Sequence, residues 1–315
     1  MKDLAPIAVF AFNRPEHLER LFASLDRNPE TADSPFYLFC DGPRGVADET
    51  LVRRVHDAID RFARSHRAVV EKRALNLGLA ASITAGIAMV LQNHDRFIVL
   101  EDDLVLSPQF LRFMNEALTA FKDQPEIGCV SGYMYPVPLD EPKSVLLPFV
   151  TSWRWGTWGD RWERYNPNGR ELARRIKETG RRHAFNLDDS FHCWGMLQDQ
   201  VDGWNSSWWI RWYASLFLEG RLSVWPGVSL LMNEGMDGSG THCGAHAHYQ
   251  GILGEQPIEM DTCVDGPSMA YMEAIKAFLR PTKHSEMLMA LRRKLPRKLF
   301  KVLRPAAHRV VSLIR

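Results

Sequence analysis

Short apolar runs alternate with amphipathic segments of helical spacing through the first 131 residues of this 315-residue chain. The runs expected to form strands are residues 7–12, 36–40, 68–70, 97–100 and 127–131. The segments expected to form helices between them are residues 15–25, 48–65, 79–91 and 108–121. Strands that alternate with helices imply right-handed crossovers, so this order predicts an α/β fold with a mostly parallel sheet flanked by helices.

Composition excludes several classes of protein. Apolar residues make up 45% and charged residues 24%, which is typical of a globular domain and not of a disordered chain. The formal net charge of +1 provides no field that attracts nucleic acid, so no nucleic-acid partner is expected. The chain has no apolar run of about 18 residues, and its first residues lack the apolar stretch of a signal peptide. Five widely spaced cysteines indicate reduced thiols, so a cytoplasmic protein is expected.

Three acidic residues, Glu101, Asp102 and Asp103, directly follow the apolar run at 97–100. Adjacent carboxylates repel one another, and a divalent cation relieves that repulsion. Carboxylate oxygens suit Mn²⁺ or Mg²⁺, and alternation along an extended segment lets Glu101 and Asp103 share a face. The alternative is a solvated strand end that caps the next helix, although Ser107 is better placed as that cap.

All ten tryptophans lie between Trp153 and Trp225. A tryptophan ring can serve as a platform for a sugar, and its N–H suits a polar cleft. The rings predicted to bind an acceptor are Trp153, Trp155, Trp158 and Trp208. The alternative is a core rich in tryptophan, to which some of the rings must belong.

Several segments resemble GT-A-fold (Rossmann-like) glycosyltransferases. Residues 99–104 with 107–111 are similar to the acidic motif of that fold, and residues 9–15, 76–79, 152–162 and 237–243 are also similar. The resemblance is closest to the inverting branch that contains N-acetylglucosaminyltransferase I and to bacterial family-2-like sugar transferases of surface-polysaccharide pathways. It covers roughly residues 5–245, and the block around 97–111 is its most specific part.

The resemblance implies roles for individual residues. It implies that Asp103 ligates a metal bridging the donor diphosphate, and that Glu101 and Asp102 contact the ribose or support the site. Asn13 and Arg14 would contact the nucleotide-sugar, where the Arg14 guanidinium offers a fork to phosphate, and Asp41 would accept from a uracil N3–H. The Asn76–Gly78 loop precedes a helix and suits ribose or phosphate contact. A surface ion pair for Arg14, and turns at Asp41 and Asn76, are the alternatives.

The catalytic base departs from the pattern of the similar enzymes. They carry an acid just ahead of a tryptophan that begins a helix, whereas this chain has Asn205, Ser206 and Ser207 before Trp208. The alternatives left as candidate bases are Asp202, Asp237 and Asp199.

A second set of candidates follows a glycine-rich turn near residue 240. His242 there is predicted to contact the metal or a phosphate, and an ordinary loop histidine is the alternative. With His246 and His248 it has a spacing that matches no strong zinc signature, so no dedicated zinc site is predicted.

The expected organisation is one GT-A-like unit with an appendage. Residues 1–130 form the nucleotide-sugar half, 131–250 the tryptophan-rich acceptor half, and 251–283 a connection. Residues 284–315 carry nine basic residues and one acid, with leucine and valine at helical spacing. Such a basic helical tail can lie on an anionic membrane surface, and the alternative is a solvated or packed helix.

These features together predict a metal-dependent, inverting glycosyltransferase. It would move a sugar of hexosyl or N-acetylhexosaminyl type from a UDP-sugar to a glycan or lipid-linked acceptor, on the inner face of the cell membrane. A carbohydrate-binding or weakly active transferase-like protein is the main alternative. A sugar-phosphate nucleotidyltransferase is less favoured because residues 11–17 contain no glycine, and a dehydrogenase because no G-x-G-x-x-G follows a strand.

Overall fold

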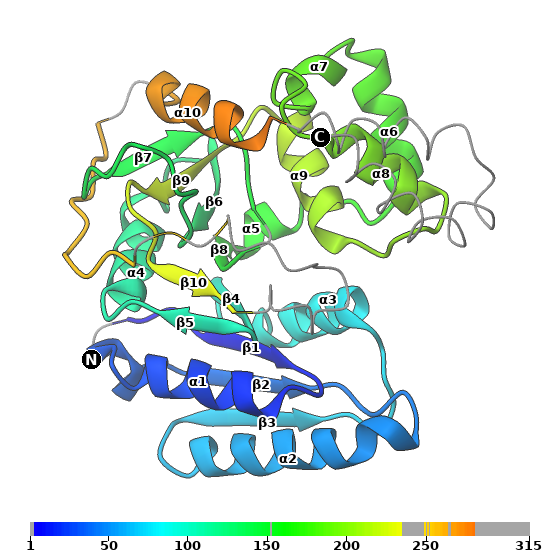
Figure 1. The fold of residues 1–315 in the computed structure, drawn as a ribbon, viewed down its shortest axis with the longest axis vertical. Helices are drawn as coiled ribbons and strands as arrows, with labels where there is room; N and C mark the ends of the chain where they lie inside the picture. Colours follow the sequence, from blue (N-terminus) through cyan, green and yellow to red (C-terminus); the bar gives the residue numbers. More distant parts are fainter. Residues whose placement is uncertain are drawn as a thin grey trace, which may run out of the picture.

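The fold is built on one eight-stranded sheet, in the strand order β3-β2-β1-β4-β8-β6-β9-β7 (Figure 1). The computed structural model describes residues 3–151, 153–234, 249, 251, 253–263 and 266–280. The strands of this sheet are β1 (Ile7–Ala11), β2 (Phe36–Cys40), β3 (Ala68–Lys72), β4 (Arg96–Glu101), β6 (Ile127–Ser131), β7 (Ser144–Leu147), β8 (Trp155–Trp158) and β9 (Leu222–Pro226). Two further strands, β5 (Leu104–Leu106) and β10 (Leu231–Asn233), pair antiparallel beside it.

The first half of the sheet is parallel. β1 pairs with β2 on one side and β4 on the other, and β2 pairs with β3. All five residues of β1, β2 and β6 are buried, as expected of strands covered on both faces. The predicted mixed α/β fold with a mostly parallel sheet flanked by helices is confirmed.

Helices cover both faces of the parallel strands. The connections β1–β2 and β2–β3 run in one direction and β3–β4 runs back, so right-handed crossovers put α1 and α2 on one face and α3 on the other. These helices are α1 (Pro15–Leu25), α2 (Val46–Ala63) and α3 (Leu79–Val90). Gly86 lets α3 approach closely, because a Cβ there would lie 2.6 Å from the ring of Phe10.

The strand β8 departs from the parallel pattern. It lies between β4 and β6 and runs antiparallel to both. Trp155 pairs with Val99 and Trp158 with Arg96, so β8 begins at the edge where β4 ends. This orientation brings the residue just before β8 to the carboxyl edge of the parallel strands.

The remaining helices lie mainly beside the second half of the sheet (Figure 1). They are α4 (Phe110–Ala120), α5 (Gly159–Trp162), α6 (Gly169–Glu178), α7 (Arg182–Phe185), α8 (Cys193–Val201), α9 (Trp208–Leu218) and α10 (Met269–Leu279), and a short 3-10 helix spans Pro29–Ala32. The helices α6 to α9 pack on one another as a group. Within the described residues, no helix is both long and apolar enough to cross a membrane.

Candidate functional site

The carboxyl edge of the parallel strands brings acidic and basic side chains together. Glu101 is the last residue of β4, and Asp102 and Asp103 form the link to β5. Arg14 lies three residues after the end of β1 and is the N-cap residue of α1. Arg154 comes immediately before β8, which starts at this same edge because it is antiparallel. Ligands of open α/β sheets bind at such an edge.

Asp103 is held by both arginines. Its Oδ1 accepts a hydrogen bond from Arg154 Nη2 at 2.5 Å, and its Oδ2 accepts one from Arg14 Nη1 at 3.1 Å. The Arg154 side chain is 2% exposed, compared with 17% each for Arg14 and Asp103. Arg14 also lies 3.9 Å from Asp102, whose other oxygen accepts from the Phe12 N–H at 3.2 Å. These contacts join the ends of β1 and β4 and the start of β8.

Burial and crowding of charge perturb the three acids. Burial, and then the charge of Asp103, raise the pKa of Glu101 to about 8 and that of Asp102 to about 7. Burial opposes ionisation of Asp103 too, but Arg154 and Arg14 outweigh it and lower the pKa of that carboxyl. Asp103 is therefore the acid of the cluster best kept as a carboxylate, because it is the one with two guanidinium partners.

The donor chemistry of this cluster suits a hard divalent cation. Carboxylate oxygens are the ligands that Mg²⁺ and Mn²⁺ prefer, and these ions commonly take one or two protein carboxylates together with phosphate and water. Among the residues that the structure describes, no three histidine, cysteine, aspartate or glutamate side chains converge to hold a metal ion. A cation at Asp103 would take one carboxylate from these residues and would compete with an arginine for it.

Asp41, at the end of β2, holds the loop that leads into α3. It is 4% exposed, and its two oxygens accept from the N–H groups of Leu77 and Gly78 at 2.9 and 2.8 Å. Asn76 Nδ2 donates to the Gly42 carbonyl at 2.9 Å, which ties the loop to the same turn. The structure thus assigns Asp41 and Asn76 to shaping this loop, and the nucleotide contacts predicted for them stay predictions.

Asn13 connects the end of β1 to the start of α2. Its Nδ2 donates to Asp48 Oδ1 at 2.7 Å, and Asp48 also forms a salt bridge with Arg44 at 3.1 Å. The Arg44 guanidinium lies over the Phe12 ring, 4.7 Å from its centroid. These contacts hold the segment that leads to Arg14 against the start of α2, and the donor contact predicted for Asn13 stays a prediction.

Three of the four tryptophans predicted to bind an acceptor belong to the core instead. Trp155, Trp158 and Trp208 are 1%, 1% and 3% exposed. Trp155 stacks on Trp208 at 5.2 Å, and Trp158 Nε1 donates to the Leu118 carbonyl at 2.9 Å. Trp155 and Trp158 are covered because β8 lies inside the sheet, and Trp208, at the start of α9, is covered by its stacking on Trp155, so burial argues against all three as acceptor rings. Trp153 is only partly buried and stays a candidate.

Two of the candidate bases belong to α8 and not to the strands that carry the acidic cluster. Asp202 is an exposed residue that ends α8, within the group of helices α6 to α9. Asp199 lies inside the same helix. Asp237 and His242, together with His246 and His248, lie outside the described residues, as does the basic tail at 284–315.

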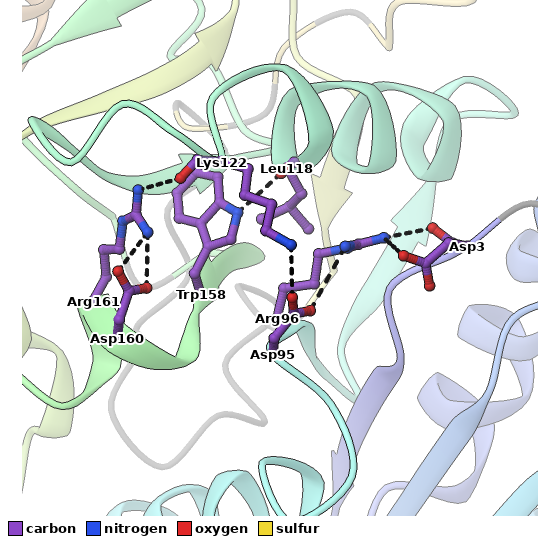
Figure 2. Close-up of polar contacts among 8 residues, drawn as sticks. All are labelled: Asp3, Asp95, Arg96, Leu118, Lys122, Trp158, Asp160 and Arg161. Atoms are coloured by element: carbon purple, nitrogen blue, oxygen red, sulfur yellow. Dashed lines mark hydrogen bonds and ion pairs between the residues drawn. The ribbon is translucent and has the colours of Figure 1, made fainter.

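A large hollow lies at the other end of the sheet. Its volume is about 990 Å³, and its lining includes Asp3, Arg96, Arg112 and Lys122. Arg96 begins β4, whereas Glu101 ends it, so the hollow is separate from the acidic cluster. In Figure 2 the Arg96 guanidinium lies between Asp3 and Asp95, with ion-pair distances of 2.9 and 3.6 Å. These acids already neutralise Arg96.

Arg154 is the residue of the site that the sequence pattern missed. It lies in the segment 152–162 that resembles GT-A-fold enzymes. Its place in the site could be predicted only by knowing that the strand after it, β8, is antiparallel to β4. A strand assumed to be parallel would have placed residue 154 at the opposite edge.

The site and sheet define an α/β protein with a charged cluster at the carboxyl edge of its parallel strands, and partial likenesses to solved structures exist. The mannosyltransferase PcManGT from Pyrobaculum calidifontis, in complex with GDP-Man and Mn²⁺, is 13% identical with a TM-score of 0.37, over 51% of this chain and 49% of that one. TarS 1–349 from S. aureus is similar with a TM-score of 0.33 in complex with UDP (13% identity, 47% and 41% covered) and 0.32 with UDP-GlcNAc (14%, 46% and 40%).

These likenesses cover less than half of each of those solved chains, and they concern part of the fold. No family model and no curated protein matches the sequence.

Proposed function

We propose that this protein is a glycosyltransferase that uses a nucleotide-sugar donor, with a UDP-sugar as the first candidate. The observation that carries the proposal is the meeting of three acids with Arg14 and Arg154 at the carboxyl edge of the sheet. A nucleoside diphosphate is the leaving group of sugar transfer, and guanidinium groups and a carboxylate-bound cation are the chemistry that neutralises it. The sequence resemblance to GT-A-fold enzymes also supports a glycosyltransferase.

The donor would lie across the ends of β1, β2 and β4. Arg14 stands at the N-terminus of α1, where backbone N–H groups and the helix dipole favour an anion. The loop held by Asp41 lies beside the end of β2, and Leu75 and Leu77 on that loop are exposed. Apolar side chains next to a polar clamp suit a nucleobase, so this loop is the proposed base-binding wall.

Asp103 is the residue that would hold Mn²⁺ or Mg²⁺, with Glu101 and Asp102 behind it. The cation would supply charge neutralisation for the departing nucleoside diphosphate. The chain's own contribution is twofold: Arg14 and Arg154 lower the pKa of Asp103 and hold its side chain, and their positive charges also compete with a cation for its oxygens.

Transfer is proposed to invert the anomeric centre. A carboxylate would remove the proton from the acceptor hydroxyl, which attacks from the face opposite the leaving group. Asp202 and Asp237 are the proposed candidates for that base. Replacing each by asparagine should separate them, because loss of the base lowers kcat with little change in donor affinity.

The acceptor is proposed to be a glycan or a lipid-linked sugar of surface-polysaccharide synthesis. Trp153, which packs edge-on against Tyr133 and Tyr249, is the proposed acceptor ring. The basic residues at 284–315 are proposed to hold the enzyme on an anionic membrane. A variant lacking these residues should not sediment with vesicles containing phosphatidylserine, and unchanged sedimentation would refute the membrane role.

The test of the donor site is titration calorimetry of UDP and of GDP, each with and without Mn²⁺. Wild-type protein should bind UDP more tightly with Mn²⁺, and Asp103→Ala should lose that dependence while its circular dichroism spectrum stays unchanged. A screen of UDP-sugars for transfer or slow hydrolysis then identifies the sugar. If the folded protein binds neither nucleotide, the transferase proposal is wrong.

A further inference from the structure

Arg154 occupies an unusual position for an arginine. Its side chain is 2% exposed, and its backbone φ is 50°, in the left-handed region that non-glycine residues seldom adopt. The residue is held there from both ends. Its carbonyl accepts from the Gly132 N–H at 2.9 Å, and its Nη2 donates to Asp103. A conformation of this kind persists only where the surroundings impose it, and such positions cluster at ligand-binding sites.

The Arg154 guanidinium also has unused hydrogen-bonding capacity. Its Nε is buried and has no hydrogen-bond partner among the described residues. A guanidinium carries five N–H donors in a planar fork, and leaving a buried donor unpaired is costly. A second oxygen ligand beside Asp103 would satisfy this donor, and phosphate presents oxygens with the spacing that the fork matches.

Asp103 offers no oxygen that is free of an arginine in this structure. Arg154 donates to one oxygen and Arg14 to the other, so a divalent cation on this carboxylate lies beside at least one guanidinium, whose positive charge opposes its binding. Arg14 is partly exposed and can turn toward solvent, whereas Arg154 is enclosed. When Arg154 loses Asp103 it therefore needs another anion close by.

We propose that Arg154 is a donor-binding residue, which holds Asp103 before the donor binds and passes to the donor's diphosphate when Asp103 takes a divalent cation. The inference rests on the proposed function and adds to it a residue that both restrains cation binding and recognises phosphate. It involves an exchange of ionic partners only, and no covalent bond changes. The exchange makes cation and nucleotide bind cooperatively, because each supplies what the other displaces.

The experiment compares Arg154→Gln with wild type. Mn²⁺ binding without nucleotide is followed by the electron paramagnetic resonance signal of free Mn²⁺, and UDP binding with Mn²⁺ by calorimetry. Loss of the competing arginine should tighten Mn²⁺ binding by about tenfold, and loss of the phosphate partner should weaken UDP binding by about tenfold or more. Arg154→Gly is a second variant, expected to fold because glycine adopts a φ of 50° without strain.

Arg96→Gln is the matched control. Arg96 begins the same strand that Glu101 ends, is likewise buried and paired with an aspartate, and likewise has a buried Nε without a partner among the described residues (Figure 2). Its substitution should leave both affinities as in wild type.

The outcomes separate the two proposals. Unchanged Mn²⁺ affinity in folded Arg154 variants overturns the exchange, and so does tighter Mn²⁺ binding with unchanged UDP affinity, which would make Arg154 a counter-ion only. If wild-type protein binds Mn²⁺ but neither UDP nor GDP, the proposed function fails and the inference fails with it. Equal effects of Arg96→Gln and Arg154→Gln also overturn the inference, because the change would then not be local.

Discussion

Replacing Asp41 by asparagine tests how the loop before α3 is held. The carboxylate accepts the Leu77 and Gly78 N–H groups on separate oxygens, and Arg73 lies 3.8 Å away. Asparagine keeps one oxygen and puts an NH₂ group in place of the other, so one N–H loses its acceptor and faces a donor. Hydrogen bonds to charged groups contribute about 1.5–3 kcal/mol each, and we expect a loss of that size.

The loss should appear first as local opening. A loop destabilised by about 1.5–3 kcal/mol exchanges its amide hydrogens about 10- to 150-fold faster, because each 1.4 kcal/mol is a factor of ten in the opening equilibrium. Hydrogen exchange with mass spectrometry should therefore show faster exchange in peptides that contain Leu77 and Gly78. UDP affinity should fall as well, if this loop forms the wall for the base.

Asp48→Asn is the matched control, because Asp48 contacts Asn13 and Arg44 and not the loop. It should leave exchange at Leu77 and Gly78 unchanged. If Asp41→Asn also leaves it unchanged in a folded protein, Asp41 does not hold the loop. If exchange rises while UDP affinity is unaltered, the loop is held as described but is no part of the nucleotide site.

Three further predictions concern the cluster, the turn and the core. Burial raises the pKa of Glu101 from its ordinary 4.5 to about 8, so the folded state keeps a proton that the unfolded chain loses. The stability that this group contributes is complete below pH 4.5 and is lost as the pH rises to about 8. Glu101→Gln should therefore make the melting temperature depend less on pH between these values. A variant whose melting temperature varies with pH as in wild type would contradict the raised pKa. Gly42→Ala puts a Cβ 2.7 Å from the backbone of Ala74 and Leu75, so it should cost about 1–3 kcal/mol in urea unfolding, and a neutral effect would show that the turn can yield. Trp158→Phe leaves the Leu118 carbonyl without its donor, so it should lower the free energy of unfolding by about 1–3 kcal/mol while the KM for the acceptor stays unchanged. A raised KM with unaltered stability would instead support Trp158 as an acceptor platform.

The parallel half of the fold could be predicted from local pattern. The strands expected at 36–40 and 127–131 have the observed bounds of β2 and β6, and the helix expected from Pro15 has the bounds of α1. The apolar period and the proline at the helix start are local signals, and tertiary contacts agree with them. Other bounds shifted by one or two residues, as at α2, which begins at Val46.

The second half could not be predicted in the same way. β8 is four residues long, and its direction is set by its neighbours β4 and β6, which are distant in the sequence. The roles of the tryptophans could not be predicted either, because tryptophan is suited both to a buried core and to a ligand-binding cleft. Seven of the ten are buried, and only the three-dimensional arrangement separates them from Trp153.

For the site, the acidic residues were predicted because they directly follow an apolar run, and Arg14 because it lies near the end of another run, in a segment that resembles the GT-A fold. Their convergence agrees with the rule for the carboxyl edge of parallel strands. Asp41 and Asn76 were found at the expected edge, but their contacts with the loop depend on how the chain turns after β3. The position of Arg154 in the site depends on the direction of β8, which the sequence around Arg154 does not indicate.

The insertion of β8 between β4 and β6 has a mechanical consequence. Its backbone is hydrogen-bonded on both sides, so the strands β1 to β4 and the strands β6, β7 and β9 belong to one continuous sheet. Opening a hinge between them would tear that sheet, which is far costlier than moving a surface loop. Whatever rearranges when ligands bind must therefore be side chains and segments at the rim of the sheet, and the scaffold that carries Glu101 and Arg154 acts as a fixed frame. A site built in this way gains its selectivity from the exchange of ionic partners on a rigid sheet and not from the closure of two domains.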